Sequence, residues 1–203
     1  MGQYYVGYVN HNGKEKAFDN RVDNDWQGVK LMEHSYRHNL YVGNVVNDLF
    51  YNKGKVCWVG DYYSEEDYSQ INCDNKELVK AIGEFAWGTE FKKAVYAKST
   101  RKKVRFLDGC LIVNHTKKQI LICDDYYEKN KWFEEWEGKQ YPCAVHPLPL
   151  LTCSANHSGG SYYGINKDKC GIWFNDTLEI VLDYDLEKYM HKGYVIVEFE
   201  FHE

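Results

Sequence analysis

Short apolar runs on either side of polar turns predict two β-hairpins. In the first, residues 5–9 and 16–18 flank Asn10-His11-Asn12-Gly13. Asn-Gly between apolar runs favours a type I′ turn, because both residues tolerate a positive φ. In the second, residues 110–113 and 120–123 flank another polar turn. Each half of the chain is therefore predicted to contain a hairpin.

Helical spacing of apolar residues indicates two helices. One covers residues 40–50, before a plausible stop at Lys53-Gly54. The other covers residues 74–95, where Asp74 and Glu77 form a capping-box-like start. The second is predicted to be the longest helix.

Strands and one loop complete the pattern. Apolar runs predict strands at residues 55–59 and 178–182, and alternation at residues 195–201 predicts another. Residues 142–160 contain all three prolines, which predicts a loop.

The chain contains an internal repeat. Val9-Asn10-His11 recurs as Val113-Asn114-His115, each in a predicted hairpin turn. Further matches in the same order are Leu31 and Ser35 with Leu150 and Ser154, Tyr41-Val42-Gly43 with Tyr162-Tyr163-Gly164, and Asp61-Tyr62 with Asp183-Tyr184. One insertion near residues 132–142 reconciles their spacings. Several positions that repeat together indicate a duplication.

These patterns predict an α+β fold, mostly antiparallel sheet, with two similar halves joined by the helix at residues 74–95. The chain is expected to be a single compact unit. Its parts would be a first repeat at 1–63, a helical connector at 64–109 and a second repeat at 110–203.

Composition narrows the function classes. Aromatic residues make up 16% of the chain, which favours sheet and leaves aromatic surface for binding. The net charge of −5 argues against non-specific nucleic-acid binding, and the basic run at residues 98–105 is interpreted as a solvated linker.

The chain is expected to act in the cytoplasm with reduced thiols. It begins without the features of a signal peptide, and no apolar run approaches the roughly 20 residues of a membrane span. Its seven cysteines are an odd number at irregular spacing, which disfavours a disulfide framework.

Several segments resemble a family of small uncharacterised proteins of low-GC bacteria and their phages. They are residues 1–5 (MGQYY), 28–35 (GVKLMEHS), 58–62 (WVGDY) and 146–152 (HPLPLLT). The resemblance implies a phage or mobile-element setting, hence the host cytoplasm, and no established activity. Its relatives carry a richer glycine run where this chain has residues 156–160, which weakens a glycine-loop function here.

Two sets of side chains could support metal or nucleophilic chemistry. Cys143, His146, Cys153 and His157 are donors that Zn²⁺ accepts, but their spacing fits no standard finger, so ordinary loop residues are the favoured interpretation. Cys153 with His157, or Ser35 with His38, could pair as nucleophile and base. Neither pair lies in a known nucleophile motif, and no cofactor or metal is predicted.

Other residues suit ligand binding. The segment Ser158-Gly159-Gly160-Ser161 could let backbone N–H groups approach a phosphate, although a flexible turn is favoured. Asp61 and Asp183 are repeat mates that could share a cation or a proton, although strand-end Asp residues more often bond the backbone. The predicted ligand-binding set is His34, His38, Asp61, His157, Gly159, Gly160, Tyr162 and Asp183.

The sequence favours a non-enzymatic binding protein that counters host defence. Its partner would be a nucleotide-like small molecule or a host defence or toxin protein, with a homodimer left open. The alternative is a hydrolase of nucleotides or nucleic acid that uses His34, His38, His157, Asp61 and Asp183. A structural or assembly protein is a third class, which a large flat apolar face would favour.

Overall fold

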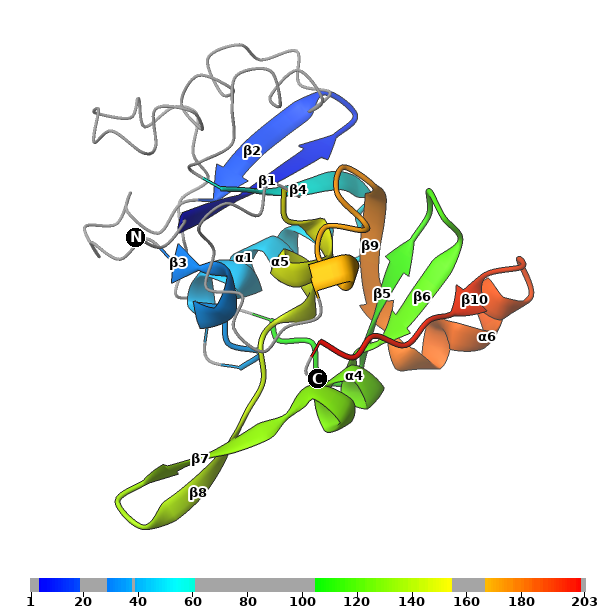
Figure 1. Ribbon diagram of the computed structural model, residues 1–203. Helices are drawn as coiled ribbons and strands as arrows, with labels where there is room; N and C mark the ends of the chain where they lie inside the picture. The colour runs from blue at the N-terminus through cyan, green and yellow to red at the C-terminus, as the bar shows by residue number, and fades with distance from the viewer. Residues whose placement is uncertain (1–3, 19–28, 38, 61–104, 155–166, 202–203) are drawn as a thin grey trace, which may run out of the picture.

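The centre of the molecule is a β-sheet, seen in a computed structural model that describes residues 4–18, 29–37, 39–60, 105–154 and 167–201 (Figure 1). Within these ranges eight strands form one sheet in the order β10-β6-β5-β9-β4-β1-β2, with β3 beside β1. Only β10 and β6 pair in parallel. The strands are β1 (Tyr4–His11), β2 (Lys14–Phe18), β3 (Val29–Lys30), β4 (Gly54–Gly60), β5 (Cys110–Asn114), β6 (Gln119–Ile122), β9 (Thr177–Leu182) and β10 (Val195–Ile196). The prediction of a mostly antiparallel α+β fold is confirmed.

Helices cover both faces of this sheet. Alternation along β5 separates the faces, because Ile112 belongs to the main core whereas Leu111 and Val113 belong to a second cluster with Tyr189 of α6. The main core also contains the fully buried Trp58. The helices are α1 (Leu40–Leu49), α4 (Cys123–Asn130), α5 (Pro147–Thr152) and α6 (Leu186–Met190), with 3₁₀ turns η2 (Leu31–Glu33), η4 (Lys167–Lys169) and η5 (Asp183–Asp185).

Both predicted hairpins are confirmed. In the first, β1 and β2 pair up to His11 opposite Lys14, and the two turn residues Asn12 and Gly13 have φ of 51° and 87°. These values fit the type I′ turn that Asn-Gly favours. The second hairpin joins β5 and β6, with Asn114 opposite Gln119.

The two halves of the sheet meet where β4 pairs with β9. The Tyr51 N–H, just before β4, donates to Ile180 O of β9, and the Asn175 N–H, just before β9, donates to Val56 O of β4, each over 2.8 Å. The spacing from 51 to 175 equals that from 56 to 180, and both donors have a positive φ. The duplication remains a prediction, and this exchange of bonds is the arrangement that a pseudo-twofold axis would produce.

Part of the predicted loop at residues 142–160 is wrong, because residues 147–152 form α5. Pro147 occupies the first helical turn, where its missing N–H costs no hydrogen bond, and the His146 side chain accepts from the Leu148 N–H at 3.1 Å. The prolines therefore start a short helix instead of preventing one. Pro142 lies in a strand, β8 (Lys139–Cys143), which pairs with β7 (Trp132–Trp136) in a separate two-stranded ribbon.

The predicted strand at residues 195–201 is also too long. Only β10 pairs, with β6, and beyond it Phe199 and Phe201 are buried in the main core. The alternation thus reflects burial of alternate side chains without a continuing strand. The predicted helix at residues 40–50 and the strands at 55–59 and 178–182 are confirmed as α1, β4 and β9.

Other predictions lie outside the described residues or can be compared with the structure only within them. The helix predicted at residues 74–95 falls in the undescribed range 61–104. Within the described ranges all cysteines are free. In the same part of the chain, no helix is both long and apolar enough to cross a membrane.

Candidate functional site

The repeated Asn-His pair lies at the tips of the two hairpins, and the asparagine has the same role in both. Asn10 Oδ1 accepts from the Gly13 N–H at 2.8 Å, and Asn114 Oδ1 accepts from the Lys117 N–H at 3.0 Å. Each side chain bonds a backbone group three positions ahead. The asparagine of the repeat therefore stabilises the turn.

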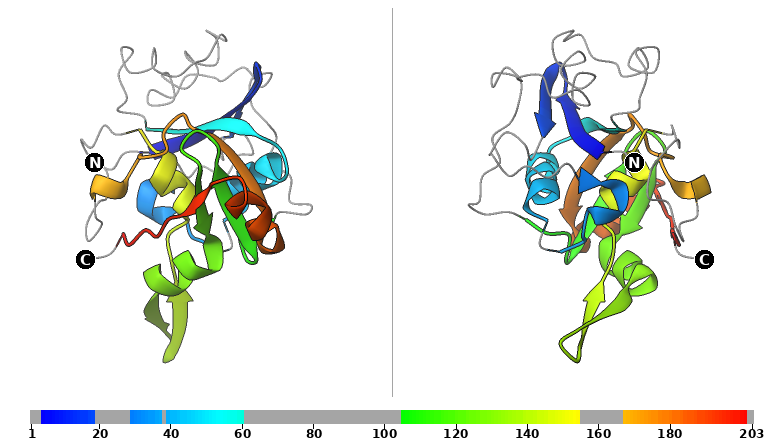
Figure 2. Two further views of the ribbon diagram at one scale, coloured as in Figure 1. Left: turned by 90° about the vertical axis from the view of Figure 1, so that its right-hand side faces the viewer. Right: turned by 60° about the vertical axis from the view of Figure 1, so that its left-hand side comes forward.

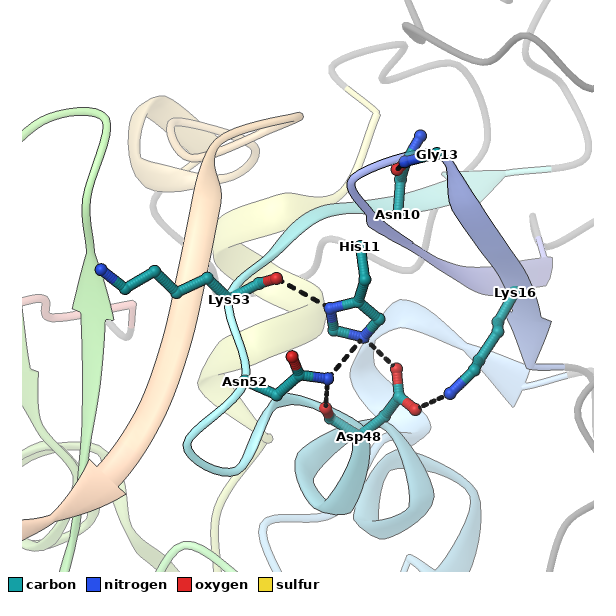
Figure 3. A network of polar contacts seen from close by, with 7 residues as sticks. All are labelled: Asn10, His11, Gly13, Lys16, Asp48, Asn52 and Lys53. Carbon is teal, nitrogen blue, oxygen red and sulfur yellow. Dashed lines mark hydrogen bonds and ion pairs between the residues drawn. The ribbon is translucent and has the colours of Figure 1, made fainter.

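The histidine of the first tip joins three elements (Figure 3). His11 Nε2 lies 2.5 Å from Asp48 Oδ2 of α1, and its Nδ1 lies 2.8 Å from Lys53 O, just before β4. The other carboxylate oxygen of Asp48 accepts from Lys16 Nζ of β2. This network holds the hairpin tip, the helix and the entry to β4 together.

The partners of His11 define its protonation. Each ring nitrogen faces an oxygen acceptor, and Nε2 lies closer to Asp48 Oδ2 than to the amide nitrogen of Asn52, at 2.5 and 3.3 Å, so we assign a proton to each nitrogen. The hydrogen bond to Asp48 raises the pKa of His11 above its ordinary value, although burial opposes this. Burial alone would raise the pKa of Asp48, but hydrogen bonds from His11 and Lys16 bring it below its ordinary value. The pair is therefore an ion pair with a carboxylate shared between two cations.

A cavity of about 330 Å³ opens beside this network. Its lining is Asn10, Asn12, Gly13, Lys53, Gly54, Lys55 and Thr177. It lies between the first hairpin tip and the point where Lys55 of β4 pairs with Thr177 of β9. Because His11 bonds the Lys53 carbonyl, the ion network positions one wall of the cavity.

The cavity is cationic. It is lined by Lys53 and Lys55, and its lining contains no acidic residue. Neither lysine forms an ion pair with any acid of the described ranges, although the charge of Lys53 helps to lower the pKa of Glu179. Lysine ammonium groups can bind a phosphate or carboxylate group. The His11 ring already donates from both nitrogens, so this arrangement favours binding over proton transfer.

The second tip is closed by its own residues. His115 Nε2 lies 2.8 Å from Glu179 Oε2 of β9, which also accepts from Tyr189, and His115 Nδ1 lies 2.7 Å from the Tyr194 hydroxyl. Burial would raise the pKa of Glu179, but hydrogen bonds from His115 and Tyr189 lower it below the ordinary value. The tip lysine, Lys117, pairs with Asp176 at 2.8 Å.

Two of the eight predicted ligand-binding residues are described, and they lie in different surroundings. His34 is fully buried, where its Nε2 accepts from Trp58 Nε1 at 3.1 Å and its Nδ1 faces Leu31 O at 3.1 Å. Burial lowers the pKa of His34 to about 4, so it is a neutral core residue. Asp183 is exposed at the start of η5, after β9. The other six, His38, Asp61, His157, Gly159, Gly160 and Tyr162, lie outside the described residues.

Three of the four zinc candidates are described, each with a local contact. The Cys143 thiol lies near Tyr141 O, His146 caps α5, and the Cys153 thiol bonds Leu150 O at 3.3 Å. No three His, Cys, Asp or Glu side chains of the described ranges gather as metal ligands would. His157 and His38 lie outside those ranges, so the pairs Cys153–His157 and Ser35–His38 are each described for one member only.

Sequence reasoning missed Asp48, Lys53 and Lys55. A single lysine near a strand end is normally interpreted as a solvated residue. Asp48 contacts His11 and Lys16 only because α1 packs against the hairpin. The recurring Asn-His pair is the feature of the sequence that points to these tips, but it does not by itself reveal a role for them. Comparison of the chain with protein-family models, curated proteins and solved structures gave no match.

Proposed function

We propose that this protein is a binding protein that captures a small phosphate-bearing, nucleotide-like anion in the cavity beside the first hairpin tip. The observation that supports this is the pair Lys53 and Lys55, which line a cavity whose lining has no acidic residue. In a phage or mobile-element setting, such capture would remove a nucleotide signal of host defence. The proposal includes action in the host cytoplasm.

The chemistry of the cavity favours phosphate over a neutral ligand. Hydrogen bonds that involve a charged group contribute about 1.5–3 kcal/mol each, roughly twice the neutral value. Two ammonium groups can therefore supply most of the affinity for one phosphate. Thr177 and Asn12 also line the cavity and can add neutral hydrogen bonds.

Isothermal titration calorimetry tests the proposal. We expect the wild type to bind ATP and inorganic phosphate but not adenosine, and Lys55→Gln to weaken ATP binding by about tenfold, near 1.4 kcal/mol. Lys192→Gln, an equal charge change on an exposed lysine after α6, is the matched control and should leave affinity unchanged. Failure of the wild type to bind any phosphate compound would contradict the proposal.

The same samples separate capture from hydrolysis. ATP recovered unchanged after long incubation supports a binding protein, whereas conversion to diphosphate or monophosphate supports the alternative hydrolase. That alternative remains a prediction, because His38, His157 and Asp61 lie outside the described residues.

A further inference from the structure

The β7–β8 ribbon extends away from the rest of the molecule in all views (Figures 1 and 2). It corresponds to the place where the internal repeat requires an insertion. Its strands pair from Trp132 opposite Cys143 to Trp136 opposite Lys139, around a turn in which Glu137 and Gly138 have φ of 50° and 72°. Residues 133–142 are all exposed.

The ribbon exposes large aromatic side chains. Phe133, Trp136 and Tyr141 are 57%, 70% and 46% exposed. Trp136 lies on the same face as Glu134, and Glu134 is opposite Tyr141, so Trp136 and Tyr141 share a face. Phe133 lies on the other face, opposite Pro142. An isolated two-stranded ribbon is marginally stable in water, and Trp and Tyr are the side chains most enriched at binding hot spots.

The two edges of the ribbon differ. Residues that flank a two-residue turn form a hydrogen-bonded pair, and the pair type alternates along an antiparallel ladder. Counting from Trp136 and Lys139, the pairs Glu135–Gln140 and Phe133–Pro142 have their backbone groups directed outward. Pro142 has no N–H, so the β8 edge lacks a donor there. The β7 edge presents the N–H and C=O of both Phe133 and Glu135.

Charge indicates the chemistry of the partner. β7 and its turn carry three acidic residues, Glu134, Glu135 and Glu137, whereas β8 carries one basic residue, Lys139. A strand placed beside β7 would therefore be attracted if it carried basic side chains. Within the described chain no strand occupies that edge, because β7 and β8 form a two-stranded sheet.

We infer that the β7–β8 ribbon is a docking arm for a protein partner, which adds an extended, lysine- or arginine-rich strand to the open edge of β7. Backbone hydrogen bonds to Phe133 and Glu135 provide affinity, and the partner's alternating side chains contact Trp136 on one face and Phe133 on the other. The arm is separate from the Lys53–Lys55 cavity, and neither site depends on the other.

A synthetic peptide in which lysine alternates with valine is the probe, and a peptide of identical composition with its lysines clustered at one end is the control. We expect the alternating peptide to bind more tightly and to slow amide hydrogen exchange at Phe133 and Glu135, as followed by nuclear magnetic resonance. Equal affinity for the two peptides would reduce the interaction to general electrostatics and overturn the inference.

Paired proline variants test the edge itself. Glu135→Pro removes an outward N–H of β7 and should reduce peptide affinity by more than about tenfold. Gln140→Pro makes the same change at the opposite position on β8 and should reduce it by less than about twofold. Glu135→Gln measures the contribution of charge alone. Equal losses for the two proline variants would contradict strand addition at β7, and circular dichroism with exchange at Trp136 verifies that the ribbon still forms.

Discussion

The two hairpin tips begin with the same Asn-His pair and end with opposite surroundings. At the first tip, the residue before the central strand β4 is Lys53, which lines an open cavity. At the second tip, the residue before the central strand β9 is Asp176, which neutralises the tip lysine Lys117. A shared turn motif therefore carries no ligand chemistry by itself. The two tips differ in the charge of the residue before the central strand, which is positive at Lys53 and negative at Asp176.

The histidines show the same contrast. His11 takes its carboxylate from helix α1 and shares it with a lysine, whereas His115 takes Glu179 from the adjacent strand and shares it with a tyrosine. The first arrangement connects a helix to the cavity wall through the Lys53 carbonyl. The second joins the tip only to β9, α6 and Tyr194. Ligand binding should be weakened by changes at the first tip and not by changes at the second.

Removal of the shared carboxylate should give the largest effect. Asp48→Asn removes the negative charge and replaces one of the two oxygens that face His11 and Lys16 with an NH2 donor. The Asp48 side chain is only 12% exposed, so we expect a loss of about 3 kcal/mol in unfolding free energy. Urea denaturation measures this, and calorimetry should show weaker ATP binding. Glu179→Gln is the counterpart at the second tip and should destabilise the fold without weakening ATP binding, because it removes an acid that interacts with Lys53. A fall in ATP affinity for Glu179→Gln would break the comparison.

Reversal of the charge at Lys53 should give the second largest effect. Lys53→Asp gives the first tip the acid that precedes the central strand at the second, and we expect ATP affinity to fall by about a hundredfold, near 2.7 kcal/mol. Lys192→Asp controls for the change in net charge. An affinity within error of the wild type for Lys53→Asp would place the anion elsewhere.

The turn asparagines should differ more modestly. Both amides also donate to a carboxylate, Asn114 to Asp176 at 2.8 Å and Asn10 to Glu15 at 3.2 Å, but Asn114 is fully buried whereas Asn10 is only partly buried. We expect Asn114→Ala to cost about 2 kcal/mol and Asn10→Ala about 1 kcal/mol in thermal or urea unfolding. The reverse order would show that the first tip is the more rigid one.

The pH dependence should be the smallest effect. Because the folded-state pKa of His11 is raised, its stabilising contribution is complete below the ordinary value of 6.5 and is lost as pH rises through the folded value. The stability difference between wild type and His11→Gln should therefore shrink as the solution becomes alkaline. Unfolding midpoints across a pH series measure it, and a difference that grows with pH would contradict the proton assignment.

How much the sequence could predict depended on the range of the interactions. The hairpin at Asn12-Gly13 and strands β4 and β9 follow from local patterns, and all are confirmed. Helix α5 was missed because Pro147 reads as a loop residue until its place at a helix start is known. The cationic cavity could not be predicted, because Lys55 and Thr177 become neighbours only when the two central strands pair.

The junction of β4 with β9 has a consequence for biosynthesis. β4 leaves the ribosome long before β9, so during translation it can pair with β1 while its other edge has no strand beside it. Contacts between residues so distant in sequence slow folding, and an unpaired strand edge promotes association between nascent chains. We therefore expect pairing of β4 with β9 to be the folding step that fails first when the protein is expressed at high temperature. Variants that weaken the bonds of Tyr51 or Asn175 across it should lower soluble yield before they alter the mature fold.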